Sequence, residues 1–138
     1  MTLRATRWHR TIDRAEHAMS RDIVTVRGDT SIGAAVDAAF RRGRGQVVVV
    51  DEAERFVDMV PAQLLTMALL TKLATRDESV ARVIDPDPLA VGPRTPLLEA
   101  VSLMVERGAD AAAVVDVERR VLGLLTWADI GQRIARSS

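Results

Sequence analysis

A threonine and an aspartate three residues apart are the chain's best candidates for chemistry. Thr126 and Asp129 lie in GLLTWADI, residues 123–130, where a strand-like run meets a helix-like one. An ionised carboxylate only accepts hydrogen bonds, so Asp129 suits two adjacent ribose hydroxyls. Thr126 could add its hydroxyl to the N–H groups that favour phosphate at a helix start. The pair also matches a variant of the capping box, which would contribute about 0.5 to 2 kcal/mol without any ligand.

An internal repeat bears on this choice between ligand site and cap. A shift of 65 residues aligns Ala15–Leu65 with Val80–Ile130 without a gap, and eleven of the 51 aligned positions are identical. Pro61 then stands at the position of Thr126, and Leu64 at that of Asp129. The fold therefore does not require the polar pair, which favours a ligand site. A proline can itself start a helix, however, so the cap stays an alternative.

The first half predicts the element order β-α-β-β-α. IVTV at 23–26 is a short β-branched strand, and the helix that follows is expected to end at Gly43, in the left-handed conformation. QVVVV at 46–50 is continuous, as expected for a strand covered on both faces. RFVDMV forms the next strand, and Pro61 suits the first turn of a second helix. The apolar residues of the first helix recur at helical spacing: Ile32, Ala35, Val36, Ala39 and Phe40.

The second half repeats this order with PLAV, a helix ending at Gly108, AAAVV, VLGLL and a last helix from Trp127 to about Ala135. Neither half can bury both faces of a small sheet alone, so we expect an α/β fold of two β-α-β-β-α repeats packed with pseudo-twofold symmetry. The predicted division is an N-terminal arm or helix at 1–14, a first repeat at 15–75, a linker at 76–79 and a second repeat at 80–138.

The segments GQVVVVD, GADAAAVVD and GLLTWADI, in two β-α-β-β-α units, resemble the CBS domain pair, or Bateman module. The resemblance covers about residues 15–132. It implies a stand-alone regulatory module, not an enzyme, that binds AMP, ADP, ATP or S-adenosylmethionine in a cleft between the repeats and requires no cofactor. The ligand-binding residues that it implies are Thr126, Asp129, Gly123 and Leu125, set against Ile23, Val24, Arg44 and Gly45.

Gly45 and Arg44 would have particular roles in the implied cleft. Gly45 would let the backbone approach a flat ring closely, and Arg44, or less surely Arg21, could meet a phosphate through its forked donors. The opposite cleft departs from the family pattern. Leu64 cannot accept hydrogen bonds from ribose hydroxyls, and Asp58 replaces a glycine with a charge of the wrong sign for phosphate. With Pro61 also in that cleft, we expect one nucleotide site or none.

Composition limits the alternatives. Nineteen basic and nineteen acidic residues give no global field for nucleic acid, and the chain contains no cysteine. The first twenty residues lack a continuous apolar region and residues 59–71 are too short an apolar stretch for a bilayer, so we expect a cytoplasmic protein without membrane contact. Without a cysteine, and with both histidines near the N-terminus, neither catalysis nor a metal site has support.

Two further patterns concern partners. The residues Arg4, Arg7, Arg10 and Arg14 would line one face of an N-terminal helix beside Trp8, in a region that also holds His9 and His17. Nucleic-acid contact by this arm is a weaker alternative to a solvated or packed face. Leu64, Leu65, Ala68, Leu69 and Leu70 make the helix after Pro61 unusually apolar. We expect a homodimer through this helix, and a ligand-free dimerisation or protein-interaction module is the main alternative function. The sequence does not identify the effector protein.

Overall fold

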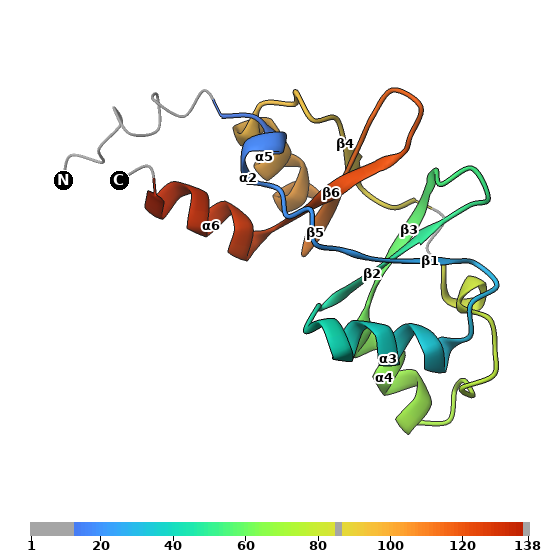
Figure 1. The fold of residues 1–138 in the computed structure, drawn as a ribbon. Helices are drawn as coiled ribbons and strands as arrows, with labels where there is room; N and C mark the ends of the chain where they lie inside the picture. The colour runs from blue at the N-terminus through green and yellow to red at the C-terminus, as the bar shows by residue number, and fades with distance from the viewer. Residues whose placement is uncertain (1–12, 85–86, 137–138) are drawn as a thin grey trace. The chain divides into compact units, whose positions relative to one another are not determined.

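The computed structural model describes residues 13–84 and 87–136. The chain forms two compact units, each with its own sheet (Figure 1). One, here the first-repeat unit, is Asp22–Pro88. The other, the second-repeat unit, joins Leu89–Ser138 to the N-terminal segment that ends at Arg21.

The first-repeat unit has a three-stranded sheet in the order β1-β2-β3, with β1 parallel and β3 antiparallel to β2. Its elements are β1 (Val24–Arg27), α3 (Ile32–Arg42), β2 (Gln46–Val50), β3 (Phe56–Pro61), α4 (Ala62–Leu70) and the 3-10 helix η1 (Val80–Val83). Its core forms where Ile32, Ala35 and Ala39 of α3 meet the valines of the sheet and Leu65 of α4. This confirms the predicted order of elements in the first half.

The second-repeat unit repeats this topology, with the sheet order β4-β5-β6. Its elements are α2 (Ala15–Ala18), β4 (Ala90–Val91), α5 (Leu97–Arg107), β5 (Ala111–Val115), β6 (Val121–Thr126) and α6 (Trp127–Arg136). The two sheets share even a register shift in their middle strand, between Val49 and Val50 of β2 and between Val114 and Val115 of β5. The expected mixed α/β fold with two repeated units is therefore confirmed.

Identical residues in the two repeats make identical local structures. Gly43 and Gly108 end their helices with φ of 63° and 61°, a conformation that costs glycine little. Asp51 accepts hydrogen bonds at Oδ1 from the N–H groups of Ala53 and Arg55, at 2.8 and 2.9 Å. Asp116 does the same for Glu118 and Arg120, both at 2.9 Å. These aspartates close the hairpin turns, which explains why VVD recurs.

The N-terminal segment packs on the second repeat, although the repeat alignment assigns residues 15–21 to the first. The N–H of Ala15 donates to the Thr95 carbonyl at 2.8 Å, and the N–H of Leu97 donates to the Asp13 carbonyl at 2.8 Å. Ser20 forms an antiparallel bridge with Leu124 on β6, at 2.8 and 2.9 Å. The helix α2 is therefore an added element of the second-repeat unit.

Two details differ from the sequence prediction. Phe40 was expected on the buried face of its helix but is 86% exposed, and Val105 at the equivalent position of α5 is exposed too. Eight residues of an α-helix overshoot two full turns by about 80°, which carries Phe40 away from the core stripe begun by Ile32. Pro61 ends β3 with extended backbone, so α4 begins one residue later, at Ala62. No helix within residues 13–84 and 87–136 has the length and apolar character needed to span a bilayer.

Candidate functional site

Thr126 and Asp129 form a reciprocal pair where β6 meets α6. The Asp129 carboxylate accepts through Oδ2 from the Thr126 N–H at 3.0 Å and from the Thr126 hydroxyl at 2.8 Å. The Asp129 N–H in turn donates to Thr126 Oγ1 at 3.2 Å. This is the geometry of a capping box, so the cap predicted as one alternative exists.

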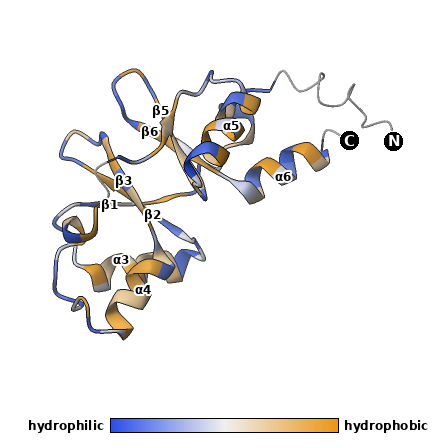
Figure 2. Ribbon diagram, turned by 180° about the vertical axis from the view of Figure 1, so that it is seen from behind, coloured by the Kyte–Doolittle hydropathy of each residue, from blue (hydrophilic) through white to orange (hydrophobic). Residues whose placement is uncertain are grey.

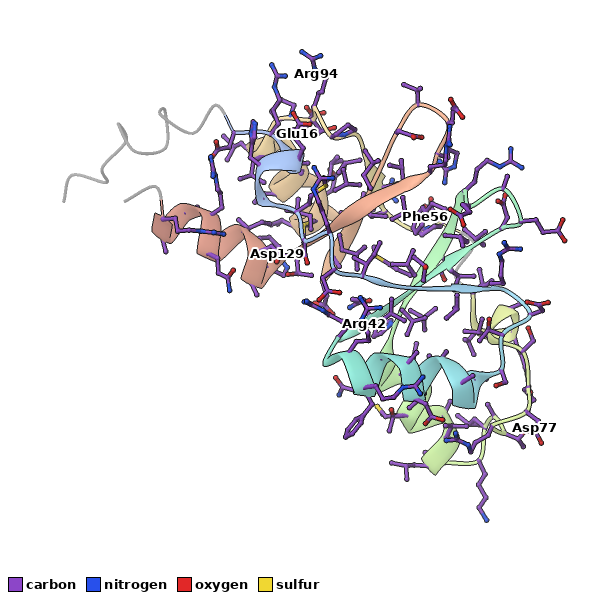
Figure 3. The ribbon with its side chains drawn as sticks, in the orientation of Figure 1. Glu16, Arg42, Phe56, Asp77, Arg94 and Asp129 are labelled. Atoms are coloured by element: carbon purple, nitrogen blue, oxygen red, sulfur yellow. The ribbon has the colours of Figure 1, made fainter. Side chains whose placement is uncertain are left out.

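The cap leaves part of the carboxylate unused. Both hydrogen bonds to Asp129 end on Oδ2, and Oδ1 has no hydrogen-bond partner among the described residues. The side chain is half-buried at the end of the sheet, where Figure 3 labels it. The hydrogen bond from the Thr126 hydroxyl holds the Asp129 carboxylate in place. The structure thus allows Asp129 to cap the helix and to accept from a ligand hydroxyl at once.

The matching junction of the first repeat, between β3 and α4, has no capping box and no carboxylate at the position of Asp129. Pro61 stands before α4, where it offers no side-chain hydrogen bond to the helix N-terminus. Leu64, at the position of Asp129, is exposed. Helix α4 forms nonetheless, so the cap is not a condition for this fold.

The other two candidates on β6 are buried. Leu125 is a core residue of the second-repeat unit. A Cβ at Gly123 would lie 2.6 Å from the Ser20 carbonyl oxygen and 3.0 Å from the Met19 sulfur, so glycine is needed there for packing. Trp127, the next residue after Thr126, donates from Nε1 to the Ala109 carbonyl at 3.2 Å.

The remaining four candidates belong to the first-repeat unit. Ile23 and Val24 line a depression of about 370 Å³ together with Thr25, Ala38, Arg41 and Arg42. Gly45 has open space where a Cβ would stand, with no atom within 4 Å in the described structure. Its carbonyl accepts from the Ala62 N–H at 2.9 Å. The eight predicted ligand residues therefore form two groups of four, one in each unit.

Arg44 takes part in a charge cluster that the sequence analysis did not identify. Its Nη2 and that of Arg42 both donate to the carboxylate of Asp22, one to each oxygen. Hydrogen bonds from Arg44 and then Arg42 hold the pKa of Asp22 below its usual range. Nε of Arg44 is buried and lacks a hydrogen-bond partner in the part of the chain that the structure describes. The recurrence of Asp22 and Arg42 as Asp87 and Arg107 was a signal for part of this cluster.

Asp58 and the N-terminal residues complete the predicted set. Asp58 is 1% exposed on β3, and its Oδ1 accepts from the Met59 N–H at 2.7 Å. His17 accepts at Nδ1 from the Arg14 N–H at 2.8 Å. Within the described ranges, no three acidic or histidine side chains are placed to hold a metal ion. Arg4, Arg7, His9 and Arg10 lie outside the described residues.

Comparison with known proteins places the chain in a family. The sequence profile of the CBS domain matches twice, at residues 15–70 and 80–136, so this chain belongs to the CBS domain family and carries two copies. It is 31% identical over 119 residues to an uncharacterized protein of Methanocaldococcus jannaschii, a match that spans 86% of this chain. The match spans only 27% of that relative's length.

Solved structures agree on the fold. The CBS domain pair of protein MJ0100, in complex with 5'-methylthioadenosine and S-adenosyl-L-methionine, matches with a TM-score of 0.81 at 19% identity. That match covers 92% of this chain and 99% of the other. The structure of CBSX2 in complex with AMP matches with a TM-score of 0.76 at 21% identity, covering 89% of this chain and 96% of the other. The described architecture is therefore that of a CBS domain pair.

Proposed function

We propose that this chain is a regulatory module that binds one adenosyl ligand, with Asp129 of the second repeat as the ribose contact. The proposal rests on the junction of β6 and α6, where the cap orients Asp129 and leaves Oδ1 without a partner among the described residues. A carboxylate held in this way can accept a hydrogen bond from a ribose hydroxyl without rearrangement of the protein. The adenosyl compounds in the two similar CBS pairs support the choice of ligand.

The first repeat carries the other four candidate residues: Ile23, Val24, Arg44 and Gly45. Ile23 offers apolar contact for a flat base beside the buried Val24, and the open space at Gly45 admits a ring close to the backbone. The equivalent set on the opposite side would rely on Leu64, which cannot accept hydrogen bonds, and on the buried Asp58. We therefore propose one site and not two.

The proposed regulatory action follows from linkage. A ligand shifts an equilibrium between two arrangements of the protein only by its difference in affinity for them. We propose that the adenosyl ligand has such a difference in affinity. An effector protein that binds one arrangement better would then respond to the ligand. We propose no catalytic step for this chain.

Binding measurements test the proposal. We expect at least one of AMP, ADP, ATP and S-adenosylmethionine to bind in calorimetric titration and to raise the melting temperature. At a ligand concentration of one hundred times Kd, the free energy of unfolding should rise by about 2.7 kcal/mol. Asp129→Leu introduces leucine, the residue type that the first repeat has at the equivalent position, Leu64. We expect it to weaken binding by about tenfold or more, since a hydrogen bond to a charged group is lost. Absence of binding by all four compounds would sink the proposal.

A matched control separates ligand contact from helix capping. Ser31 caps α3 by accepting at Oγ from the Ala34 N–H at 3.1 Å. Ser31→Ala and Asp129→Leu should both lower the stability of the free protein, by about 0.5 to 2 kcal/mol. Only Asp129→Leu should weaken ligand binding. If Ser31→Ala weakens binding as much, lost stability and not a lost contact is the cause.

The second candidate function is a ligand-free interaction module. It is favoured by the exposed side chains of Leu64, Met67 and Leu70 on α4. The two candidates differ in one observable: an interaction module should show no stabilisation by adenosyl compounds and should self-associate or capture a partner with or without them.

A further inference from the structure

Arg133 on α6 is held by a carboxylate from the other end of the chain. Its Nε and Nη2 donate to the two carboxylate oxygens of Asp13, at 2.9 and 2.8 Å. The Asp13 side chain is 13% exposed and that of Arg133 35%, so water and salt screen this pair only in part. Two parallel hydrogen bonds of this kind permit one geometry, which fixes the direction in which the guanidinium leaves the helix.

The backbone that carries Asp13 is fixed as well. The Asp13 carbonyl accepts from the Leu97 N–H at 2.8 Å. Two residues further on, α2 packs on α6, where Ala15 and Ala18 share a hydrophobic core with Ile130. The carboxylate therefore stands beside α6 as a rigid acceptor and does not move with the guanidinium.

A second carboxylate lies within reach of the same guanidinium. Asp129 precedes Arg133 by four residues, so both side chains leave α6 on one face, about one turn apart. Figure 3 labels Asp129 at the β6 end of this helix. An acidic residue four positions before a basic one is the order that pairs best on a helix. The structure nevertheless directs Arg133 to Asp13, so two carboxylates compete for one guanidinium and Asp13 holds it.

The first repeat has no counterpart of this competition. The shift of 65 residues places Leu64 and Ala68 where α6 has its carboxylate and its arginine. Glu78 corresponds to Asp13, and it pairs with an arginine of its own segment, four residues later. The shared topology therefore needs neither charge on this helix. Both occur in the repeat that also carries the candidate ligand contact.

We propose that Asp13 is a positioning residue for the ligand contact: it holds Arg133 away from Asp129 and so keeps Oδ1 open to a ligand hydroxyl. The inference rests on the proposed function, because it concerns the oxygen that is assigned to the ligand there. When Asp13 loses its charge or its contact, Arg133 turns to the carboxylate four residues before it and closes the ligand contact. The N-terminal segment thereby controls ligand affinity from within one unit.

Calorimetric titration of the full chain with AMP, ADP, ATP and S-adenosylmethionine tests this inference. Asp13→Asn removes the charge that holds Arg133, so it should weaken every compound that binds by about threefold or more. The double variant Asp13→Asn/Arg133→Gln removes the competing guanidinium as well and should restore the affinity to within about twofold. Unchanged binding in Asp13→Asn, or no recovery in the double variant, would overturn the inference.

Arg133→Gln alone is the matched control. It breaks the same ion pair as Asp13→Asn, but it leaves no guanidinium that could turn to Asp129. Binding should therefore stay within about twofold of the unmodified protein. If the ion pair acts only by stabilising the fold, both single variants lose affinity to the same extent. That result would also contradict the inference.

A measurement without ligand separates this inference from the proposed function. Urea denaturation gives the coupling between Asp129 and Arg133 from a double-mutant cycle with Asp129→Asn and Arg133→Gln. The two side chains should be uncoupled while Asp13 holds the guanidinium. In the Asp13→Asn background a coupling of about twofold in the unfolding equilibrium constant should appear.

The outcomes of the two measurements are distinct. Coupling in the Asp13→Asn background without binding of any of the four compounds would refute the proposed function and leave the competition between the two carboxylates standing. Absence of coupling in that background would overturn the inference, whichever compound binds.

Discussion

The carbonyl oxygen of Ser20 lies 2.6 Å from the point that a Cβ atom would occupy at Gly123. The contact is part of a bridge in which Ser20 and Leu124 exchange two main-chain hydrogen bonds, at 2.8 and 2.9 Å. The N-terminal segment thus pairs with β6 one residue away from a position that only glycine can occupy. The glycine of GLLTWADI consequently has a packing role that needs no ligand, and Asp129 is the residue of this segment to which we assign the proposed ligand contact.

Gly123→Ala should destabilise the protein. The new methyl group would meet the Ser20 carbonyl oxygen, a main-chain atom that cannot rotate away, and overpacking of this kind costs about 1 to 3 kcal/mol. Chemical denaturation of the free protein measures the loss. Gly131→Ala is the matched control, because Gly131 lies within α6 with open space at its Cβ position. It should stabilise the protein by up to about 1 kcal/mol through helix propensity. Equal effects of the two substitutions would contradict the assigned packing role.

Asp13 and Arg133 join the N-terminal segment to α6 across 120 residues. Arg133 donates from Nε and Nη2 to the two carboxylate oxygens, at 2.9 and 2.8 Å, and the Asp13 side chain is only 13% exposed. The hydrogen bonds from Arg133 hold the pKa of Asp13 below its usual value, and the charge of the same group adds to this. A carboxylate with a lowered pKa in the folded state stabilises the fold wherever it is ionised.

The stability contributed by Asp13 should therefore depend on pH. It is fully present above the pKa of an unfolded aspartate, about 4, and it is lost as the pH falls through the lower value of the folded protein. Asp13→Asn should lower the urea midpoint near neutral pH, and the difference from the unmodified protein should shrink below about pH 4. Asp37→Asn, in a pair with Arg76 that is exposed on both sides, is the control and should have a smaller effect. A difference that is constant with pH would refute the assignment.

Helix α4 presents apolar side chains on the surface of the first-repeat unit. Leu70 is 78% exposed, Leu64 and Met67 are also exposed, and residues 62–71 include no charged side chain. Figure 2 shows this helix as an almost wholly hydrophobic ribbon. We propose that this face packs on the same face of a second copy, since an uncharged surface is complementary to itself in a twofold dimer.

Leu70→Glu should convert the proposed dimer to a monomer, because two carboxylates would face each other without water. Analytical ultracentrifugation gives the mass directly. Val117→Glu is the control, since Val117 is a fully exposed apolar residue in a hairpin turn of the other unit. A monomeric unmodified protein, or a dimer that survives Leu70→Glu, would contradict the proposal.

Local patterns predicted most of the fold. The shift of 65 residues predicted two copies, and strand and helix periodicities gave the order of elements in each. Gly43 and Gly108 were identified as helix ends because only glycine takes the left-handed conformation at low cost. Phe40 was misplaced because spacing alone does not locate the edge of a buried helix face. The junction of Thr126 and Asp129 was recognised, and its capping geometry was one of the two stated alternatives.

The sequence by itself determined the repeat, its elements and the asymmetry between the two strand-to-helix junctions, because these depend on residues close together in the chain. Only the tertiary structure decided which partners meet from far away. It pairs Asp13 with Arg133, brings the Ser20 carbonyl against Gly123, and hydrogen-bonds Asp22 to both Arg42 and Arg44. Such contacts depend on how the chain closes on itself, and no local preference of these residues encodes them. The charge cluster of Asp22, Arg42 and Arg44 is therefore a product of the fold, whereas the capping pair of Thr126 and Asp129 is already written in GLLTWADI.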